Sequence, residues 1–251
     1  MKRIGMNIVA TIEARMTSAR LPGKVLLPAA SKPMLEHLVN RLRRVPSIAA
    51  IVLATTVNDT DQVLVDFAAA QKISCFRGSE ADVMSRVMGA GESSRADLIV
   101  EITGDCPIID PLIIEQTIQM FLHNRCDYCS NCHIRTYPMG METQVFRLDT
   151  LKRSYAMTSN PLDHEHVTRH IRLHPEMFTH VTLVAPPDLF WPELGLTLDE
   201  PADYELLTKI IEYFADKNPN FGCREVIDLL RRHHPEWVEI NTTVRRKGIN
   251  Q

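Results

Sequence analysis

The stretch that decides the fold covers residues 7–26 and reads NIVATIEARMTSARLPGKVL. Its first six residues, NIVATI, are mostly apolar and rich in β-branched side chains, which predicts a buried strand. A helix is predicted to begin at about Pro33. The connection between them is roughly 20 residues long, whereas a plain strand-to-helix connection takes about 2–6. It is also basic and contains a Pro-Gly turn, so we expect it to bind a ligand.

The composition is that of a globular protein with one locally basic loop. The chain has 251 residues, 45% of them apolar and 24% charged, and a net charge of −3. This length suits one large domain or two small ones. The net charge does not favour a nucleic-acid binder, whereas a local basic loop suits a small anion. No apolar run reaches the ~18 residues of a membrane span, and the six cysteines lack a secretory context, so we expect a cytoplasmic protein.

Strands and helices alternate along the first half of the chain. Strands are predicted at 48–56, 73–76 and 96–103, and helices at 59–70, 80–92 and 111–122. Such repeated strand–helix units predict a mostly parallel sheet with helices on both faces, which is a three-layer α/β fold.

The alternation becomes less regular after residue 124. Strands are predicted at 126–131, 143–148 and 178–185, and helices at 148–157, 163–173, 202–214 and 224–232. We therefore expect one α/β domain over residues 1–251, with a smaller lobe at about 124–190 that contacts an acceptor or a second subunit.

Polar side chains gather where the predicted strands end. In open α/β sheets, ligands bind beyond the carboxyl ends of the strands. Four stretches occupy such ends: the loop at 13–24, the pair Thr55 and Thr56, residues 76–79, and residues 104–107. Their arginines, lysine, hydroxyls, glycines and aspartate suit a polyphosphate with a divalent cation. A long solvated basic loop explains the same residues, and the usual phosphate-loop ending is absent because Val25 follows Lys24.

The loop resembles the signature R-x-x-S-x-R-L-P-G-K of the cytidylyltransferases that activate sugars and sugar acids. Every fixed position is present: Arg15, Ser18, Arg20, Leu21, Pro22, Gly23 and Lys24. The similarity continues through residues 32–42, 76–86, 101–111, 127–131, 164–171 and 196–207. It is greatest to the branch typified by spore coat polysaccharide biosynthesis protein F. Related branches activate 3-deoxy-manno-octulosonate and nonulosonic acids.

This resemblance implies a fold of the nucleotide-diphospho-sugar transferase type and a reaction. CMP would pass from CTP to a sugar acid or a related surface-glycan precursor, with release of pyrophosphate and with Mg²⁺ as cofactor. We also expect a homodimer. Arg15 and Lys24 would grip the phosphates, and Asp105 and Asp199 would be catalytic residues that hold the metal. Asp199 has a second interpretation, as the cap of a helix that begins at Pro201.

The resemblance also assigns further binding residues. The nucleotide would contact Ser18, Arg20, Gly23, Thr55, Arg77, Ser79 and Asp82. The acceptor would contact Glu142, Gln144, His164 and His166.

One segment departs from the family pattern. Relatives often contain Y-P-x-G-x-D-x-E-V-F, whereas residues 137–146 read YPMGMETQVF. Glu142 therefore stands where Asp is usual, and Gln144 stands where Glu is usual. These changes predict a different acceptor from that of the nearest relatives. Two alternatives stay open: transfer to a non-sugar phosphate or phosphonate, and a nucleotide-binding protein without turnover.

Two clusters have the residue types of metal sites. Cys126, Cys129 and Cys132 are three apart, but residues three apart on a strand point to opposite faces. His166, His170 and His174 would share one face if residues 163–173 formed a helix. Thiols on an ordinary strand, and histidines at the acceptor or a subunit contact, explain both clusters without a metal.

Overall fold

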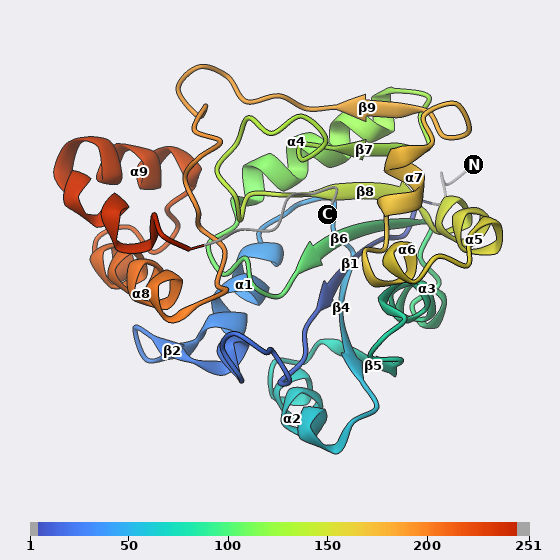
Figure 1. Cartoon of the computed structure of the whole chain (residues 1–251), viewed down its shortest axis with the longest axis horizontal. Helices are drawn as coiled ribbons and strands as arrows, with labels where there is room; N and C mark the ends of the chain where they lie inside the picture. The colour runs from blue at the N-terminus through green and yellow to red at the C-terminus, as the bar shows by residue number, and fades with distance from the viewer. Residues whose placement is uncertain (1–4, 245–251) are drawn as a thin grey trace.

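The computed structural model describes residues 5–244, which form a seven-stranded sheet with helices on both faces (Figure 1). The strand order is β5-β4-β1-β6-β8-β7-β9, and only β8 runs antiparallel to its neighbours. The strands are β1 (Ile8–Glu13), β4 (Ala50–Thr56), β5 (Ser74–Gly78), β6 (Leu98–Thr103), β7 (Tyr128–Ser130), β8 (Gln144–Arg147) and β9 (His180–Thr182). The prediction of a mostly parallel sheet is confirmed.

Three groups of helices surround this sheet. One face is covered by α1 (Met34–Leu42), α2 (Gln62–Ala70) and α4 (Pro111–His123). The other face is covered by α3 (Val83–Ser93), α5 (Leu148–Met157) and α7 (Arg169–Leu173). A third apolar cluster contains α8 (Pro201–Ala215) and α9 (Cys223–Asp228), which lie to one side of the sheet (Figure 1). Within residues 5–244, none of the helices combines the length and apolar composition that crossing a bilayer requires.

The central position of β1 brings the polar loops together. Its residues Val9, Ala10 and Ile12 are fully buried, as the apolar run predicts. Glu13 is level with Ala54 of β4 on one side and with Thr103 of β6 on the other. Since all three strands run parallel, the loops that follow them leave the same edge of the sheet.

The segment at 124–190 contributes to the main sheet. Its strands β7, β8 and β9 extend the sheet beyond β6, and α5 and α7 pack on the same face as α3. Its role as an acceptor or dimer lobe stays a prediction.

The prediction of a single helix at 163–173 is wrong. The structure has α6 (Pro161–Glu165) and α7, separated by a bend at Val167, whose φ is +22°. Val167 is buried against the sheet, and the Thr168 hydroxyl donates to Gln144 Oε1 at 2.6 Å. These tertiary contacts override the local helical pattern. His166 and His170 therefore do not share one helical face.

The basic loop after β1 is tied to the end of β4 by a buried carboxylate. Asp61 Oδ1 accepts a hydrogen bond from the backbone N–H of Met16 at 2.8 Å. Asp61 Oδ2 accepts from the hydroxyls of Thr55 and Thr56, at 2.9 and 2.6 Å, and from the Thr56 N–H at 3.2 Å. Sequence analysis did not single out Asp61, although it holds two of the predicted ligand-binding stretches together.

A left-handed glycine then turns the loop back toward the sheet. Gly23 has φ +69°, a conformation that favours glycine, and its N–H donates to Met16 O at 3.0 Å. A short 3₁₀ helix, Lys24–Leu26, follows at once. The glycine of the Pro-Gly turn therefore sets the direction in which Lys24 leaves the backbone.

We predict that Asp61→Ala destabilises the fold by about 2–4 kcal/mol, because it leaves buried hydroxyls and N–H groups without their acceptor. Asp59→Ala is the matched control, since Asp59 is an exposed residue of the same turn. Urea unfolding followed by circular dichroism measures both. Equal stability of the two variants would show that Asp61 does not anchor the loop.

Candidate active site

Two aspartates from distant parts of the chain meet at one lysine. Lys24 Nζ lies 2.9 Å from Asp199 Oδ1 and 3.4 Å from Asp105 Oδ2. Asp105 follows β6 and Asp199 precedes α8, and the backbone N–H of Leu198 donates to Asp105 O at 2.8 Å. The backbone hydrogen bond holds the two carboxylate-bearing segments side by side. The predicted proximity of Asp105 and Asp199 is therefore present in the structure.

The surroundings of Asp199 exclude its role as a helix cap. Glu200 is the N-cap of α8, and Asp203 completes a capping box. Asp203 Oδ2 accepts from the backbone N–H groups of Asp199 and Glu200, at 3.1 and 3.0 Å. The Asp199 carboxylate is left to interact with cations, and Arg20 Nη2 lies 2.8 Å from its Oδ1. The interpretation of Asp199 as the helix cap is wrong, because Glu200 is the N-cap of α8.

Charge pairing favours the ionised forms of Lys24 and Asp199. Burial alone would lower the pKa of Lys24, but Asp105 and Asp199 raise it above the ordinary lysine value. Burial alone would raise the pKa of Asp199, but Lys24 and then Arg20 lower it. Asp105 is held from its other side, since Thr103 Oγ1 donates to Asp105 Oδ1 at 2.5 Å. The result is a fixed, mostly buried arrangement of opposite charges.

Two adjoining clefts open at this edge. The first, which we call the loop cleft, has a volume of about 390 Å³. Among its lining residues are Arg15, Ser18, Arg20, Lys24, Arg86 and Asp105. The second, the inner cleft, has a volume of about 340 Å³. Among its lining residues are Arg20, Asp105, Arg135, Glu142, Gln144, His166, Arg172 and Asp199. Because Arg20 and Asp105 line both clefts, the two clefts meet at the charged group.

Most predicted phosphate and acceptor residues therefore lie around two connected spaces. Arg15 lines the loop cleft, where its Nη1 lies 3.0 Å from Glu80 Oε1. Glu142 lines the inner cleft, and its carboxylate accepts a hydrogen bond from the Gly140 N–H. Burial raises the pKa of Glu142.

A second set of predicted residues lines neither cleft. Thr55 is buried and bonded to Asp61, as described above. Arg77 donates to the backbone carbonyls of Thr56 and Asn58, at 2.9 and 2.8 Å. Ser79 Oγ accepts from the Asp82 N–H at 3.0 Å. These contacts organise the loops beside the site, and direct nucleotide binding by Thr55, Arg77, Ser79 and Asp82 stays a prediction.

The structure also joins Asp82 to His164. Asp82 Oδ2 lies 2.9 Å from His164 Nδ1 and accepts from the Tyr155 hydroxyl at 3.0 Å. His164 Nε2 lies 3.1 Å from Thr158 O. Both imidazole nitrogens thus face acceptors, which favours the doubly protonated ring, and the bond to Asp82 raises the pKa of His164. The pair links the start of α3 to α6, which leads to His166 in both clefts.

Sequence analysis missed two buried carboxyls under the clefts. Glu13 ends β1 and Glu101 lies on β6, and each lines at least one cleft. Burial, together with the neighbouring Glu101, raises the pKa of Glu13, and burial raises the pKa of Glu101 to about 7. Acidic side chains inside otherwise apolar strands were the available signal. Arg86, Arg135 and Arg172 were also missed, because nothing in their local sequence indicates a cleft.

Gln144 is the centre of a buried polar network. Its Nε2 donates to Glu101 Oε2 at 2.7 Å. Its Oε1 accepts from the hydroxyls of Tyr128 and Thr168, each at 2.6 Å. The amide can serve as donor and acceptor at once, which a carboxylate at this position could not. Glutamine at position 144, where the family usually has glutamate, therefore suits the hydrogen-bonding groups around it.

The cysteine and histidine clusters lack the arrangement of a metal site. No group of three or more His, Cys, Asp or Glu side chains in the described part of the chain could hold an ion. Burial raises the pKa of Cys126, Cys129 and Cys132, which favours unreactive thiols.

The fold is of the three-layer α/β class, and the match of the sequence to a family model makes the chain a nucleotidyltransferase. A family model described as cytidylyltransferase matches residues 9–223. The chain belongs to this cytidylyltransferase family.

Two relatives and one solved structure are similar over most of the chain. An uncharacterized protein of Methanocaldococcus jannaschii is 32% identical over 98% of this chain and 99% of its own. Spore coat polysaccharide biosynthesis protein SpsF of Bacillus subtilis is 34% identical over 90% of this chain and 95% of its own. The solved structure of a cytidylyltransferase from Leptospira borgpetersenii matches with a TM-score of 0.87 and 30% identity, covering 93% of this chain and 97% of that one.

We predict that His164→Gln lowers the free energy of unfolding by about 1 kcal/mol near pH 5.5 and by less near pH 8. The raised pKa of His164 means that its stabilisation is complete below the ordinary value of about 6.5. That stabilisation declines as the pH rises through the raised value.

Chemical denaturation across this pH range measures the effect, with the exposed His123→Gln as control. If the stability difference between wild type and His164→Gln grew with pH, the charged pair of His164 and Asp82 would be contradicted.

Proposed function

We propose that this enzyme transfers CMP from CTP to a carboxylated sugar, releases pyrophosphate and requires Mg²⁺. The observation that supports it best is the convergence of Asp105 and Asp199 on Lys24, between two clefts. One cleft suits the triphosphate and the other an acceptor. Homodimerisation and a cytoplasmic location stay predictions.

The loop cleft suits the triphosphate because cations line it. Arg15, Arg20 and Lys24 come from the basic loop, and Arg86 comes from α3. Their charge-assisted hydrogen bonds would neutralise phosphate oxygens and favour pyrophosphate as leaving group. Burial lowers the pKa of Arg86, so a phosphate group would compensate its charge.

The two aspartates fit a magnesium ion. Mg²⁺ prefers oxygen ligands and is usually held by one or two carboxylates together with substrate phosphates. Asp105 and Asp199 already enclose one cation, the Lys24 ammonium, at 3.4 and 2.9 Å. When bound, the metal would screen the triphosphate and make the α-phosphorus more electrophilic. Lys24 and Arg20 would then turn from the carboxylates to the phosphate oxygens.

The inner cleft suits an anionic acceptor. Arg20, Arg135 and Arg172 line it, and a guanidinium matches a carboxylate through two parallel hydrogen bonds. Glu142 and Gln144 offer hydrogen-bonding partners for hydroxyl groups. A sugar acid carries both a carboxylate and hydroxyl groups. A sugar-acid acceptor also agrees with the resemblance of this chain to cytidylyltransferases that activate sugar acids.

The reaction follows from bringing the contents of the two clefts together. An acceptor hydroxyl oxygen in the inner cleft would form a bond to the α-phosphorus. The bond from that phosphorus to the bridging oxygen would break, pyrophosphate would leave, and the hydroxyl proton would pass to solvent. Such catalysis depends on positioning and on electrostatic stabilisation. Pyrophosphate release with CTP, Mg²⁺ and a panel of sugar acids, sugar phosphates and phosphonates tests it, and release with none of them would contradict turnover.

We predict that Asp105→Asn and Asp199→Asn each lower Mg²⁺-dependent turnover by roughly ten- to a hundredfold while the fold is kept. Each variant loses a charged ligand, and one lost charge-assisted contact costs about 1.5–3 kcal/mol, or roughly ten- to a hundredfold. Glu205→Gln is the control, since it removes a charge from an exposed residue of α8 that lines neither cleft. Near-normal turnover in either aspartate variant would remove that residue from the proposed metal site.

We predict that Gln144→Glu changes acceptor preference more than CTP affinity. The new carboxylate would stand where the amide now lies 2.7 Å from Glu101, so the pair would have to share a proton. The double variant Glu101→Gln with Gln144→Glu restores one donor and one acceptor, and should recover stability.

Steady-state kinetics with several acceptors measure the preference, and thermal unfolding measures the recovery. A weaker CTP affinity with unchanged acceptor preference would place Gln144 on the nucleotide side.

A further inference from the structure

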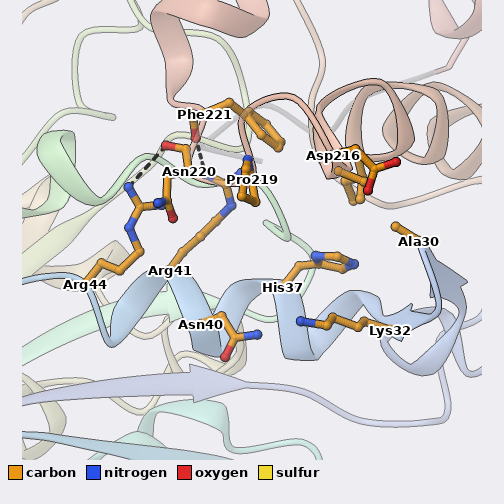
Figure 2. Close-up of a pocket in the computed structure, with 12 residues that line it drawn as sticks. Ala30, Lys32, His37, Asn40, Arg41, Arg44, Asp216, Pro219, Asn220 and Phe221 are labelled. Atoms are coloured by element: carbon orange, nitrogen blue, oxygen red, sulfur yellow. Dashed lines mark hydrogen bonds between the residues drawn. The ribbon is translucent and has the colours of Figure 1, made fainter.

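We propose that a second anion-binding site, separate from the active site, lies between α1 and the loop at residues 219–221 and binds a phosphate monoester of sugar size. The cleft there, which we call the α1 cleft, has a volume of about 380 Å³ (Figure 2). It shares no lining residue with the loop cleft or the inner cleft. The inference therefore goes beyond the proposed transferase activity.

A buried arginine without a carboxylate partner forms the centre of this cleft. Arg41 is only 5% exposed, and its Nη1 donates to Phe221 O at 2.8 Å and to Ile109 O at 3.3 Å. Its guanidinium stacks 4.2 Å from the centre of the Phe221 ring. Within residues 5–244, no carboxylate lies within ion-pair distance of Arg41, and its Nε and Nη2 make no hydrogen bond.

The acidic groups that act on Arg41, Asp110 and then Glu225, already accept hydrogen bonds from backbone N–H groups. Asp110 favours the charged form of Arg41 from a distance, but its oxygens accept from the backbone N–H groups of Leu112 and Cys223, at 2.8 and 2.7 Å. Burial lowers the pKa of Arg41 to about 10. Arg41 is held by neutral carbonyls and a ring but by no ion pair, so an anion that enters the cleft gains the charge–charge interaction that the fold does not supply.

A second arginine extends the positive end of the cleft. Arg44 lies in the turn that follows α1, three residues after Arg41, and its Nη2 donates to Asn220 O at 3.1 Å. Figure 2 shows the side chains of Arg41, on α1, and Arg44, just after it, extending toward the loop that carries Asn220 and Phe221. A planar guanidinium can bind two phosphate oxygens at once, so this end of the cleft suits a phosphate group.

The opposite end of the α1 cleft has mixed charge, and its residues indicate what the non-phosphate part of the ligand is. Lys32, His37 and Asp216 lie there, away from Arg44 (Figure 2). Lys32 Nζ is 3.6 Å from Glu36, and Asp216 has no ion pair among the described residues. A carboxylate repels phosphate but accepts hydrogen bonds from hydroxyls. The volume is in the range of small-molecule sites, so a phosphorylated sugar fits both ends.

The test is calorimetric titration of the full-length protein with glucose 6-phosphate, with inorganic phosphate and with glucose. Arg44→Gln removes a charge from an exposed residue in the turn after α1, and Asp216→Asn removes the opposing charge from the C-cap of α8. Lys24→Gln is the control for binding in the active site. Circular dichroism confirms that the variants are folded.

We expect one site that binds the sugar phosphate more tightly than inorganic phosphate and does not bind glucose. Arg44→Gln should weaken binding about tenfold, in line with the loss of one charge-assisted contact. Asp216→Asn should strengthen binding, which unfolding could not cause, and Lys24→Gln should not change it. The proposal is overturned if the wild type does not bind, if only Lys24→Gln abolishes binding, or if Arg44→Gln and Asp216→Asn both match the wild type.

Discussion

The position of the Lys24 ammonium between two carboxylates is the constraint on which the site depends. Three chain segments must meet for it to form: the loop after β1, the loop after β6, and the approach to α8. Each carboxylate is also held by another group, Asp105 by Thr103 and Asp199 by Arg20. Opposite charges that are mostly removed from water interact strongly, so the group needs a rigid frame to keep its geometry.

The sheet and its loops provide that frame. The parallel register of β1 and β6 places the loops that follow them at one edge, and the hydrogen bond from Leu198 N–H to Asp105 O adds the third segment. Asp61 anchors the basic loop, and the left-handed Gly23 turns it toward the carboxylates. The charged group then lies where the two clefts meet, which is where a nucleotide and an acceptor have to approach each other.

Much of the fold could be predicted from periodicity, because alternating strands and helices bury apolar faces in a regular way. The proximity of Asp105 and Asp199 could be predicted only through family resemblance, since no local pattern relates residues so far apart. The prediction of a single helix at 163–173 was wrong because the burial of Val167 outweighs the local helical preference. Asp61 and Arg86 were missed for a related reason: their importance comes from partners that are brought to them by folding. Glu13 and Glu101 did leave a signal, as acidic residues inside apolar strands.

The most direct test of the central claim is a crystal structure with Mn²⁺ and a non-hydrolysable CTP analogue, measured with anomalous scattering. We expect an anomalous peak between the carboxylates of Asp105 and Asp199, with Lys24 moved from them onto the triphosphate in the loop cleft. A triphosphate bound elsewhere, or a Lys24 that still bridges both aspartates while the nucleotide is bound, would contradict the account.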